Sequence, residues 1–299
     1  MKIAVCYVSF TGNTQYVAHS IKSLLEERHH SVDLILMNCA LKSTAEAKLF
    51  SSGQYDGIYF GSPTWAWRTP SIFSRILNHP DIIPDISGVP CVFFATSQSS
   101  SCIITYECAP MLEKKGAIVV DYFLTNAPFM MGKPSKFEKK KGHWAMDKRG
   151  PMETSIISSI TKIVSKTPIP AKLRKKPGVV VRLGAKIPDK TVSKMFHMPP
   201  IIESDLCIGC GLCVKKCPVD VLQLVTRDLS DEEEIVSTIS SSKSRTDKIV
   251  KVVNNDACIG CFSCQLVCPK HAIHNKKRTQ IHKFTKEMLT SAGKTGYYK

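Results

Sequence analysis

Eight of the thirteen cysteines fall into two copies of one pattern, Cys-x2-Cys-x2-Cys-x3-Cys-Pro. The first run starts at Cys207 and ends at Cys217, and the second starts at Cys258 and ends at Cys268. Iron–sulfur clusters are bound by thiolates, and three cysteines spaced by two residues on a tight loop converge on three corners of one cubane. This part of the chain must therefore fold so that it closes around two cluster sites.

The spacing resembles that of the bacterial-type two-cluster ferredoxins, in which the fourth cysteine of each run, pointed away by its proline, serves the other cluster. Two structural zinc sites and a disulfide framework are the alternatives. Zinc sites usually combine two cysteine pairs, or cysteine with histidine, at wider separation, so two complete runs favour clusters. The resemblance implies one 4Fe-4S cluster on Cys207, Cys210, Cys213 and Cys268, and a second on Cys258, Cys261, Cys264 and Cys217.

The surroundings of the two runs also repeat. Asp205-Leu206-Cys207-Ile208-Gly209-Cys210 aligns with Asp256-Ala257-Cys258-Ile259-Gly260-Cys261. An internal repeat of this kind predicts two half-domains related by a pseudo-twofold axis, neither of which closes a core or completes a cluster alone. The two clusters are therefore expected to lie close together.

Composition limits the remaining possibilities. A chain of 299 residues with 43% hydrophobic residues accommodates about two domains. No apolar run approaches the ~20 residues that span a bilayer, and the first residues do not have the pattern of a signal peptide. Eight thiolates committed to iron, with five other cysteines left over, suit a reducing cytoplasm rather than an oxidising exterior. The remaining cysteines are expected to be small buried hydrophobes, with a redox role as the alternative for the last two: Cys6, Cys39, Cys91, Cys102 and Cys108.

The amino-terminal half carries a second motif. An apolar run over residues 2–9 predicts a strand, and Val17, Ile21, Leu24 and Leu25 follow at helical spacing. A strand, a short polar loop and a helix N-terminus form an anion site, because backbone amides and the helix dipole favour a phosphate there. The loop between them resembles the phosphate loop of flavodoxins, which implies FMN binding by Ser9, Phe10, Thr11, Gly12, Asn13 and Thr14.

The segments that follow alternate between strand and helix patterns. Strands are predicted at 32–38, 57–62, 89–96 and 117–124, and helices at 43–50, 71–78, 104–115 and 153–165. This alternation predicts an α/β doubly wound parallel sheet, flavodoxin-like with strand order 2-1-3-4-5, followed by a small α+β two-cluster ferredoxin domain. The ligand is then expected at the carboxyl ends of the first, third and fourth strands.

Two loops at that edge are candidate flavin contacts. The loop after the third strand contains Pro63, Thr64, Trp65 and Trp67, and either tryptophan could stack on the flavin or serve as a core anchor. Thr96 and Ser97 begin the next loop, which lacks the tyrosine that many flavodoxins place over the second flavin face. Residues 129–144 are a candidate lid over this face, with a basic surface loop as the alternative.

The predicted domains are residues 1–165 for the flavodoxin-like domain and 201–275 for the ferredoxin domain. Residues 166–200 carry nine Lys or Arg, one Asp and six prolines, and are predicted to be an extended interdomain linker. Residues 227–248 are predicted to be an exposed polar extension, and 276–299 a basic tail. The net charge of +16 lies mainly in the linker and tail, which favours redox partners with acidic docking surfaces over nucleic acid.

Across nearly its whole length the chain resembles the flavodoxin–ferredoxin fusion proteins of anaerobic organisms. The resemblance implies an electron-transfer flavoprotein that joins FMN to two 4Fe-4S clusters and exchanges electrons with redox proteins. The alternative is an FMN-dependent reductase of a quinone, a nitro compound or oxygen. No Ser/His/Asp set or paired carboxylate demands a catalytic residue, and among nine scattered histidines only His143 is a candidate proton donor. If the cofactors of one chain were far apart, a homodimer would complete the circuit.

Overall fold

The computed structural model describes nine stretches of the chain, and the statements below refer to them. They are residues 1–42, 49–64, 68–97, 104–127, 149–170, 178–184, 186–195, 198–227 and 247–278. The described chain divides between Asp189 and Lys190 into two compact units.

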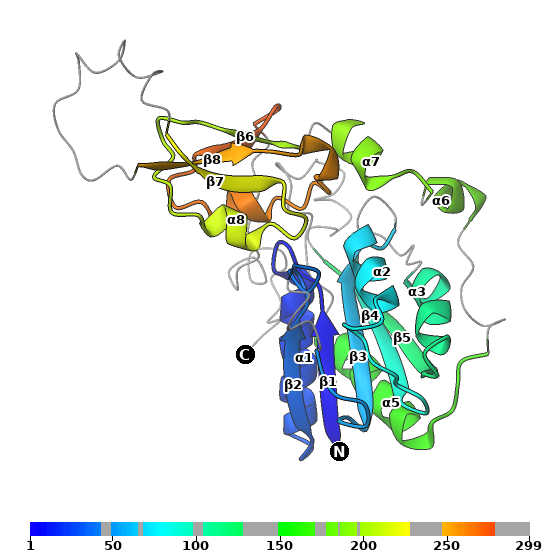
Figure 1. Cartoon of the computed structure of the whole chain (residues 1–299). Coiled ribbons are helices and arrows are strands. Elements are labelled where there is room, and N and C mark those ends of the chain that lie inside the picture. The colour runs from blue at the N-terminus through cyan, green and yellow to red at the C-terminus, as the bar shows by residue number, and fades with distance from the viewer. Residues whose placement is uncertain are drawn as a thin grey trace, which may run out of the picture. The chain divides into compact units, whose positions relative to one another are not determined.

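The first unit is built on a parallel sheet of five strands. Its order is β2-β1-β3-β4-β5, which confirms the predicted flavodoxin-like topology (Figure 1). Because the order reverses beside β1, the carboxyl ends of β1 and β3 flank the crevice where such sheets bind ligands. The strands are β1 (Lys2–Tyr7), β2 (Ser31–Leu36), β3 (Gly57–Pro63), β4 (Pro90–Ser97) and β5 (Ile118–Asn126).

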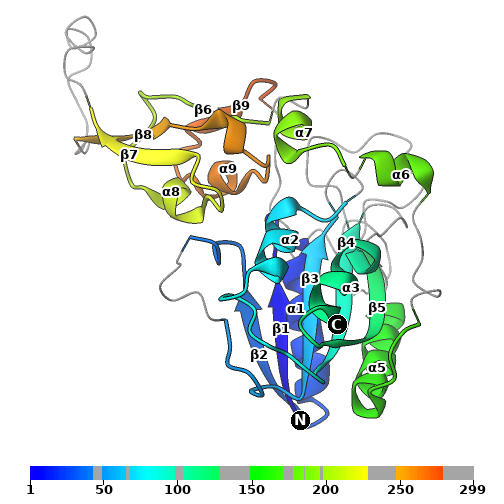
Figure 2. The ribbon, with the colours of Figure 1, turned by 45° about the vertical axis from the view of Figure 1, so that its right-hand side comes forward.

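Helices cover both faces of this sheet. α1 (Asn13–Glu26) and α5 (Arg149–Ser165) pack together on one face, and α2 (Ser71–Asn78) and α3 (Ile104–Glu113) on the other (Figure 2). Helices were predicted in each of these places. Most of the helix predicted at 43–50 lies outside the described residues. No helix in the described stretches is long and apolar enough to cross a membrane.

The core of the first unit lies against the central strands. Every residue of β4 is buried, as expected for a parallel strand covered on both faces. The Phe94 and Phe123 rings stack with their centroids 5.9 Å apart. On β3, the buried Tyr59 hydroxyl lies 2.8 Å from Ser159 Oγ and so ties the sheet to α5.

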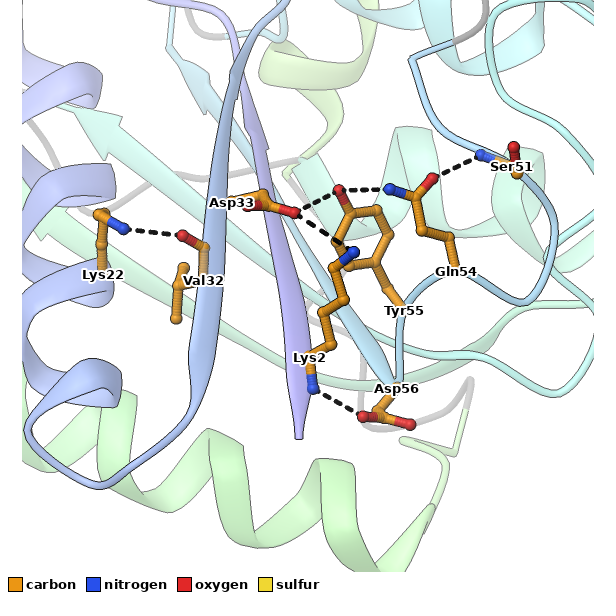
Figure 3. A network of polar contacts seen from close by, with 8 residues as sticks. All are labelled: Lys2, Lys22, Val32, Asp33, Ser51, Gln54, Tyr55 and Asp56. Carbon is orange, nitrogen blue, oxygen red and sulfur yellow. Dashed lines mark hydrogen bonds and ion pairs between the residues drawn. The ribbon is translucent and has the colours of Figure 1, made fainter.

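A polar network joins the amino-terminal ends of the first three strands, opposite the predicted ligand edge (Figure 3). The Tyr55 hydroxyl donates to Asp33 Oδ2 at 2.8 Å, and the backbone N–H of Lys2 donates to Asp56 Oδ2 at 2.6 Å. Burial and the contact with Asp33 raise the pKa of Tyr55, so its hydroxyl stays protonated as a donor. This network fixes the strand ends without occupying the ligand edge.

The segment predicted to be an extended linker contains two helices, so that prediction was wrong. They are α6 (Val179–Gly184) and α7 (Asp189–Met195). Pro188 immediately precedes α7, where a missing backbone N–H costs no helical hydrogen bond. Pro188 therefore marks the start of a short helix rather than extended chain. From Lys190 onward the segment belongs to the second unit.

The second unit shows the predicted internal repeat. α9 (Ser263–Val267) repeats α8 (Leu212–Lys216) at the same sequence offset as Cys258 repeats Cys207, and the two helices contact each other. A 3-10 turn, η3, covers Asn255–Ala257. The strands are β6 (Pro200–Ile202), β7 (Leu222–Thr226), β8 (Lys248–Val252) and β9 (Ile273–Asn275).

Each strand pair of this unit joins the two repeats. β6, which precedes the first cysteine run, pairs antiparallel with β9, which follows the second run. β7 follows the first run and pairs antiparallel with β8, which precedes the second. Within the described stretches neither repeat forms a ladder by itself, so the two halves depend on each other for these strand hydrogen bonds. The predicted polar extension lies mostly outside the described residues, between β7 and β8.

We expect Gly61→Ala to destabilise the first unit by ~2 kcal/mol, because the new Cβ would lie 2.0 Å from Cζ of the buried Phe94 ring. Urea unfolding followed by far-UV circular dichroism measures the loss. Gly178→Ala is the matched control, since no atom lies within 4 Å of its Cβ position. Equal midpoints for the two variants would contradict this account of the packing.

Candidate functional site

The first cysteine cavity lies in the second unit and draws on both cysteine runs. Three of its cysteines come from the first run and the fourth, Cys268, ends the second run. Ile202, Ile208 and Val250 contribute apolar walls. The cysteines that line it are Cys207, Cys210, Cys213 and Cys268. This is the quartet that the sequence assigns to one cluster.

The second cysteine cavity has the reciprocal composition. Cys217, which ends the first run, lines it together with three cysteines of the second run. Its other walls include Met198, Val221 and Phe262. The cysteines are Cys217, Cys258, Cys261 and Cys264. Ile273 lines both cavities, so the two sites are adjacent.

The electrostatics of the thiols follow the same grouping. Burial raises the pKa of Cys213 to about 11, with further contributions from Cys207, Cys210 and Cys268. Burial raises the pKa of Cys261 to about 12, with Cys258 and Cys217 adding to it. Four thiolates in one apolar cavity repel one another and lack solvation, so they need a bound cation to be stable.

The donor set and the cavities fit 4Fe-4S clusters. In no described part of the chain do three or more His, Cys, Asp or Glu side chains meet as ligands of a single metal ion. A cubane instead spreads four thiolates over its corners, as a cavity lined by a quartet allows. The Gly260 N–H donates to Cys258 Sγ at 3.4 Å and the Ala272 N–H to Cys268 Sγ at 3.3 Å. Such donors stabilise negative charge on cluster ligands.

The two cavities differ in exposure. In the first, only Cys213 is buried and Cys210 is exposed. In the second, only Cys264 is not fully buried. Leu206 and Leu212, which lie on either side of Cys210 in the sequence, are 43% and 40% exposed. The first cavity is therefore the more accessible to another molecule.

In the first unit, the loop between β1 and α1 has the geometry of an anion site. Gly12 precedes α1 with φ 104°, a conformation that glycine adopts without strain. The Ser9 hydroxyl accepts a hydrogen bond from the Gln15 N–H at 3.1 Å. Ser9, Asn13 and Thr14 are buried, and Phe10 and Thr11 are half-buried.

The carboxyl ends of the neighbouring strands meet this loop. The Thr14 and Thr96 hydroxyls lie 2.9 Å apart, and the Thr64 N–H donates to the Thr96 carbonyl at 2.8 Å. Thr125, the register partner of Thr96, is buried with no hydrogen-bond partner for its hydroxyl. Predicted site residues far apart in sequence are thus brought together at one edge of the sheet. Pro63 and Thr64 are half-buried there, and Ser97 is buried.

Several predicted contacts fall outside the described residues. These are Trp65, Trp67, the loop after Ser97 up to Cys102, and the candidate lid with His143. Of the cysteines outside the two runs, Cys6, Cys91 and Cys108 are buried as expected, and Cys39 is half-buried. Burial raises the pKa of the Cys6 and Cys91 thiols.

Asn38 is a loop-positioning residue that the sequence reasoning missed. Its Oδ1 accepts from the Ser9 N–H at 2.8 Å, and its Nδ2 donates to the Ser9 carbonyl at 2.5 Å. The only signal in the sequence was an asparagine at the end of the second predicted strand. Because β1 and β2 are neighbours in the sheet, the Asn38 side chain lies beside the loop and holds Ser9 through these two hydrogen bonds.

The comparisons with known proteins agree with this arrangement in the second unit. Residues 199–269 match the family model of the 4Fe-4S dicluster domain. Ferredoxin-3 of Nostoc sp. is 39% identical over 75 residues, 25% of this chain and 74% of that protein. Ferredoxin-3 of Rhodobacter capsulatus is 37% identical over 73 residues, 23% of this chain and 70% of that protein. The fold and cysteine cavities therefore define an iron–sulfur protein.

Through these residues the chain belongs to the two-cluster 4Fe-4S ferredoxin family. Among solved structures, oxidised flavodoxin 1 from Bacillus cereus is 20% identical, with a TM-score of 0.36, over 55% of this chain and 98% of that one. The strand order, rather than this similarity, assigns the flavodoxin-like fold to the first unit. The chain thus joins a flavodoxin-like sheet to a ferredoxin domain, as its sequence resemblance indicated.

We expect Asn38→Ala to loosen the loop before α1 and to cost ~1–2 kcal/mol, because the half-buried Ser9 N–H loses its acceptor. Amide hydrogen exchange should speed up in residues 9–14. The exposed Asn78 on α2 supplies the control, Asn78→Ala, for which exchange in this loop should not change. Unchanged exchange in both variants would show that Asn38 does not hold the loop.

Proposed function

We propose that this protein is an electron-transfer flavoprotein that passes electrons between FMN in the first unit and two 4Fe-4S clusters in the second. One observation carries the proposal: two cysteine quartets, each completed across an internal repeat, share a chain with a flavodoxin-type sheet and an anion-binding loop. When bound, FMN takes one or two electrons and each cluster takes one. The protein's part is to bind, orient and insulate these groups.

The ligand assignment follows the two cavities. The proposed ligands of one cluster are Cys207, Cys210, Cys213 and Cys268, and those of the other are Cys217, Cys258, Cys261 and Cys264. The lining by each quartet and the mutual effects on thiol pKa support this division. The apolar walls exclude water, and the backbone donors to sulfur stabilise the charge that a cluster gains on reduction.

The proposed FMN site is the carboxyl edge of the first unit's sheet. Residues 9–14 would hold the phosphate with backbone amides and hydroxyls at the start of α1. Pro63, Thr64, Thr96 and Ser97 would border the flavin, with Trp65 or Trp67 stacked on one face. The buried, unpartnered Thr125 hydroxyl at this edge supports a polar ligand there. The reductase alternative is not favoured, because no described feature calls for a small acceptor.

Protein partners would exchange electrons at the first cavity. Cys210 is exposed, Leu206 and Leu212 near it in the sequence are exposed and apolar, and Lys215 and Lys216 lie in the last turn of α8. An apolar contact surrounded by positive charge suits a redox protein with an acidic docking surface. A cytoplasmic location, with thiolates kept reduced before clusters assemble, completes the proposal. A second copy of the chain is a further proposed partner, in a homodimer that completes the circuit.

The anaerobically purified holoprotein should contain about eight irons per chain together with equimolar FMN. Iron, acid-labile sulfide and flavin analysis on the same sample gives the ratio. Two zincs in place of iron would refute the cluster assignment. Protein that takes up clusters and refuses FMN would refute the flavin assignment alone.

The fourth cysteine of each run lines the cavity of the other run. This arrangement predicts which cysteine variants should perturb the same cluster. Cys217→Ser, although it lies in the first run, should perturb the same cluster as Cys261→Ser, because both residues line the second cavity. Cys210→Ser should perturb the other cluster. Electron paramagnetic resonance of the reduced proteins distinguishes the two signals. FMN content should stay unchanged in all three variants.

One result would contradict this assignment of the fourth cysteine ligands. If the Cys217→Ser spectrum matched that of Cys210→Ser, each run would serve its own cluster. Variants that lose a cluster outright should retain about four irons per chain, which keeps the assignment measurable. Loss of FMN together with either cluster would argue against independent units.

A further inference from the structure

The turn that leads into the first cysteine run is held by an arginine from a later part of the chain. Within the turn, the Cys207 N–H donates to the Glu203 carbonyl at 3.1 Å. Nη2 of Arg227 donates to the Ser204 carbonyl at 3.2 Å and to the Cys207 carbonyl at 2.5 Å. Cys207 lines the first cavity. The arginine therefore contacts the backbone of a proposed cluster ligand.

The strand pair of the second unit fixes the position of this arginine. Arg227 directly follows β7, and its backbone N–H donates to the Asp247 carbonyl at 2.8 Å, which extends the pairing of β7 with β8. Its side chain is half-buried. Because the backbone is held by the ladder and the side chain by two carbonyls, the guanidinium has a fixed place beside the first run.

The second repeat uses its equivalent residues differently. Arg278 has the same offset from Arg227 as Cys258 has from Cys207, and its guanidinium pairs with the Glu203 carboxylate at 2.6 Å. The turn before Cys258 is capped instead by Asn254. Within the described stretches, contact between an arginine and the backbone of a cluster cysteine thus belongs to the first repeat.

We propose that Arg227 holds a fixed positive charge beside the first cluster and thereby raises the reduction potential of that cluster. The inference rests on the proposed binding of a 4Fe-4S cluster by the quartet that includes Cys207. An arginine side chain is charged throughout the pH range in which proteins fold. Reduction adds one negative charge to a cluster, so a nearby positive charge stabilises the reduced state more than the oxidised state. Arg227 acts through its contact with Cys207 and does not ligate iron.

The direct test is Arg227→Gln, assayed as holoprotein by redox titration under electron paramagnetic resonance. Glutamine keeps an N–H donor and removes the charge. The ratio of reduced to oxidised first cluster at a fixed potential should fall about tenfold, which is about 59 mV for one electron. The signal that Cys210→Ser perturbs identifies this cluster. Arg227→Lys keeps the charge and should restore most of the potential.

Arg278→Gln is the matched control. It removes the same charge from the equivalent position of the second repeat, where the guanidinium pairs with a carboxylate. The potential of the first cluster should move less than in Arg227→Gln. Equal shifts in the two variants would show that the net charge of the unit, and not the contact with Cys207, sets the potential.

A further variant tests the charge with the arginine in place. The exposed Ser204 donates its carbonyl to the arginine contact, so Ser204→Asp offers the guanidinium a carboxylate. The added negative charge should lower the potential of the first cluster. This variant decides the question if Arg227→Gln fails to retain its cluster, and an unmoved potential in Ser204→Asp would then overturn the inference.

The outcomes separate this inference from the proposed function. Normal iron content with an unmoved first potential in Arg227→Gln would overturn the role of Arg227 and leave the cluster assignment intact. An equal fall in Arg227→Lys and Arg227→Gln would also overturn it, because the arginine would then act by holding the turn and not by its charge. Wild-type protein without iron would remove the proposed function and this inference together.

Discussion

The second unit depends on an exchange between its two halves. Cys217 leaves its own run to line the cavity of the second, and Cys268 does the reverse. The strands do the same, because β6 pairs with β9 and β7 with β8. Neither half can satisfy its backbone or complete a thiolate quartet alone. Folding of the second unit and binding of its clusters are therefore thermodynamically coupled.

A symmetrical repeat does not give two equivalent sites. Cys210 in the first cavity is exposed, whereas the second cavity has three buried cysteines and is lined by the buried Met198. Solvent exposure and hydrogen bonds to sulfur both change cluster potentials. The two similar cysteine loops therefore lie in different surroundings.

The first unit shows how a parallel sheet assembles a site from distant residues. Thr14, at the start of α1, meets Thr96 at the end of β4, and Asn38 after β2 clamps the loop at Ser9. All three lie at the carboxyl edge because parallel strands end together there. The polar network around Tyr55 and Asp33 lies at the opposite edge, where it fixes the strands without competing for the ligand.

The sequence by itself predicted a doubly wound parallel sheet through its alternating periodicities, and the strand order through its resemblance to flavodoxins. It also predicted the two cysteine quartets through the spacing that iron ligation requires. Both signals are local and repeat along the chain. Tertiary structure decided the features that depend on contacts between distant segments. One is the pair of hydrogen bonds by which Asn38 holds Ser9, and the other is helix α7, in a segment whose prolines had predicted extended chain. Lys190 and Lys194 look like ordinary linker charges until folding places Asp256 between them. The tertiary fold decides which charged side chains form ion pairs, and the spacing of residues in the sequence does not predict those pairs.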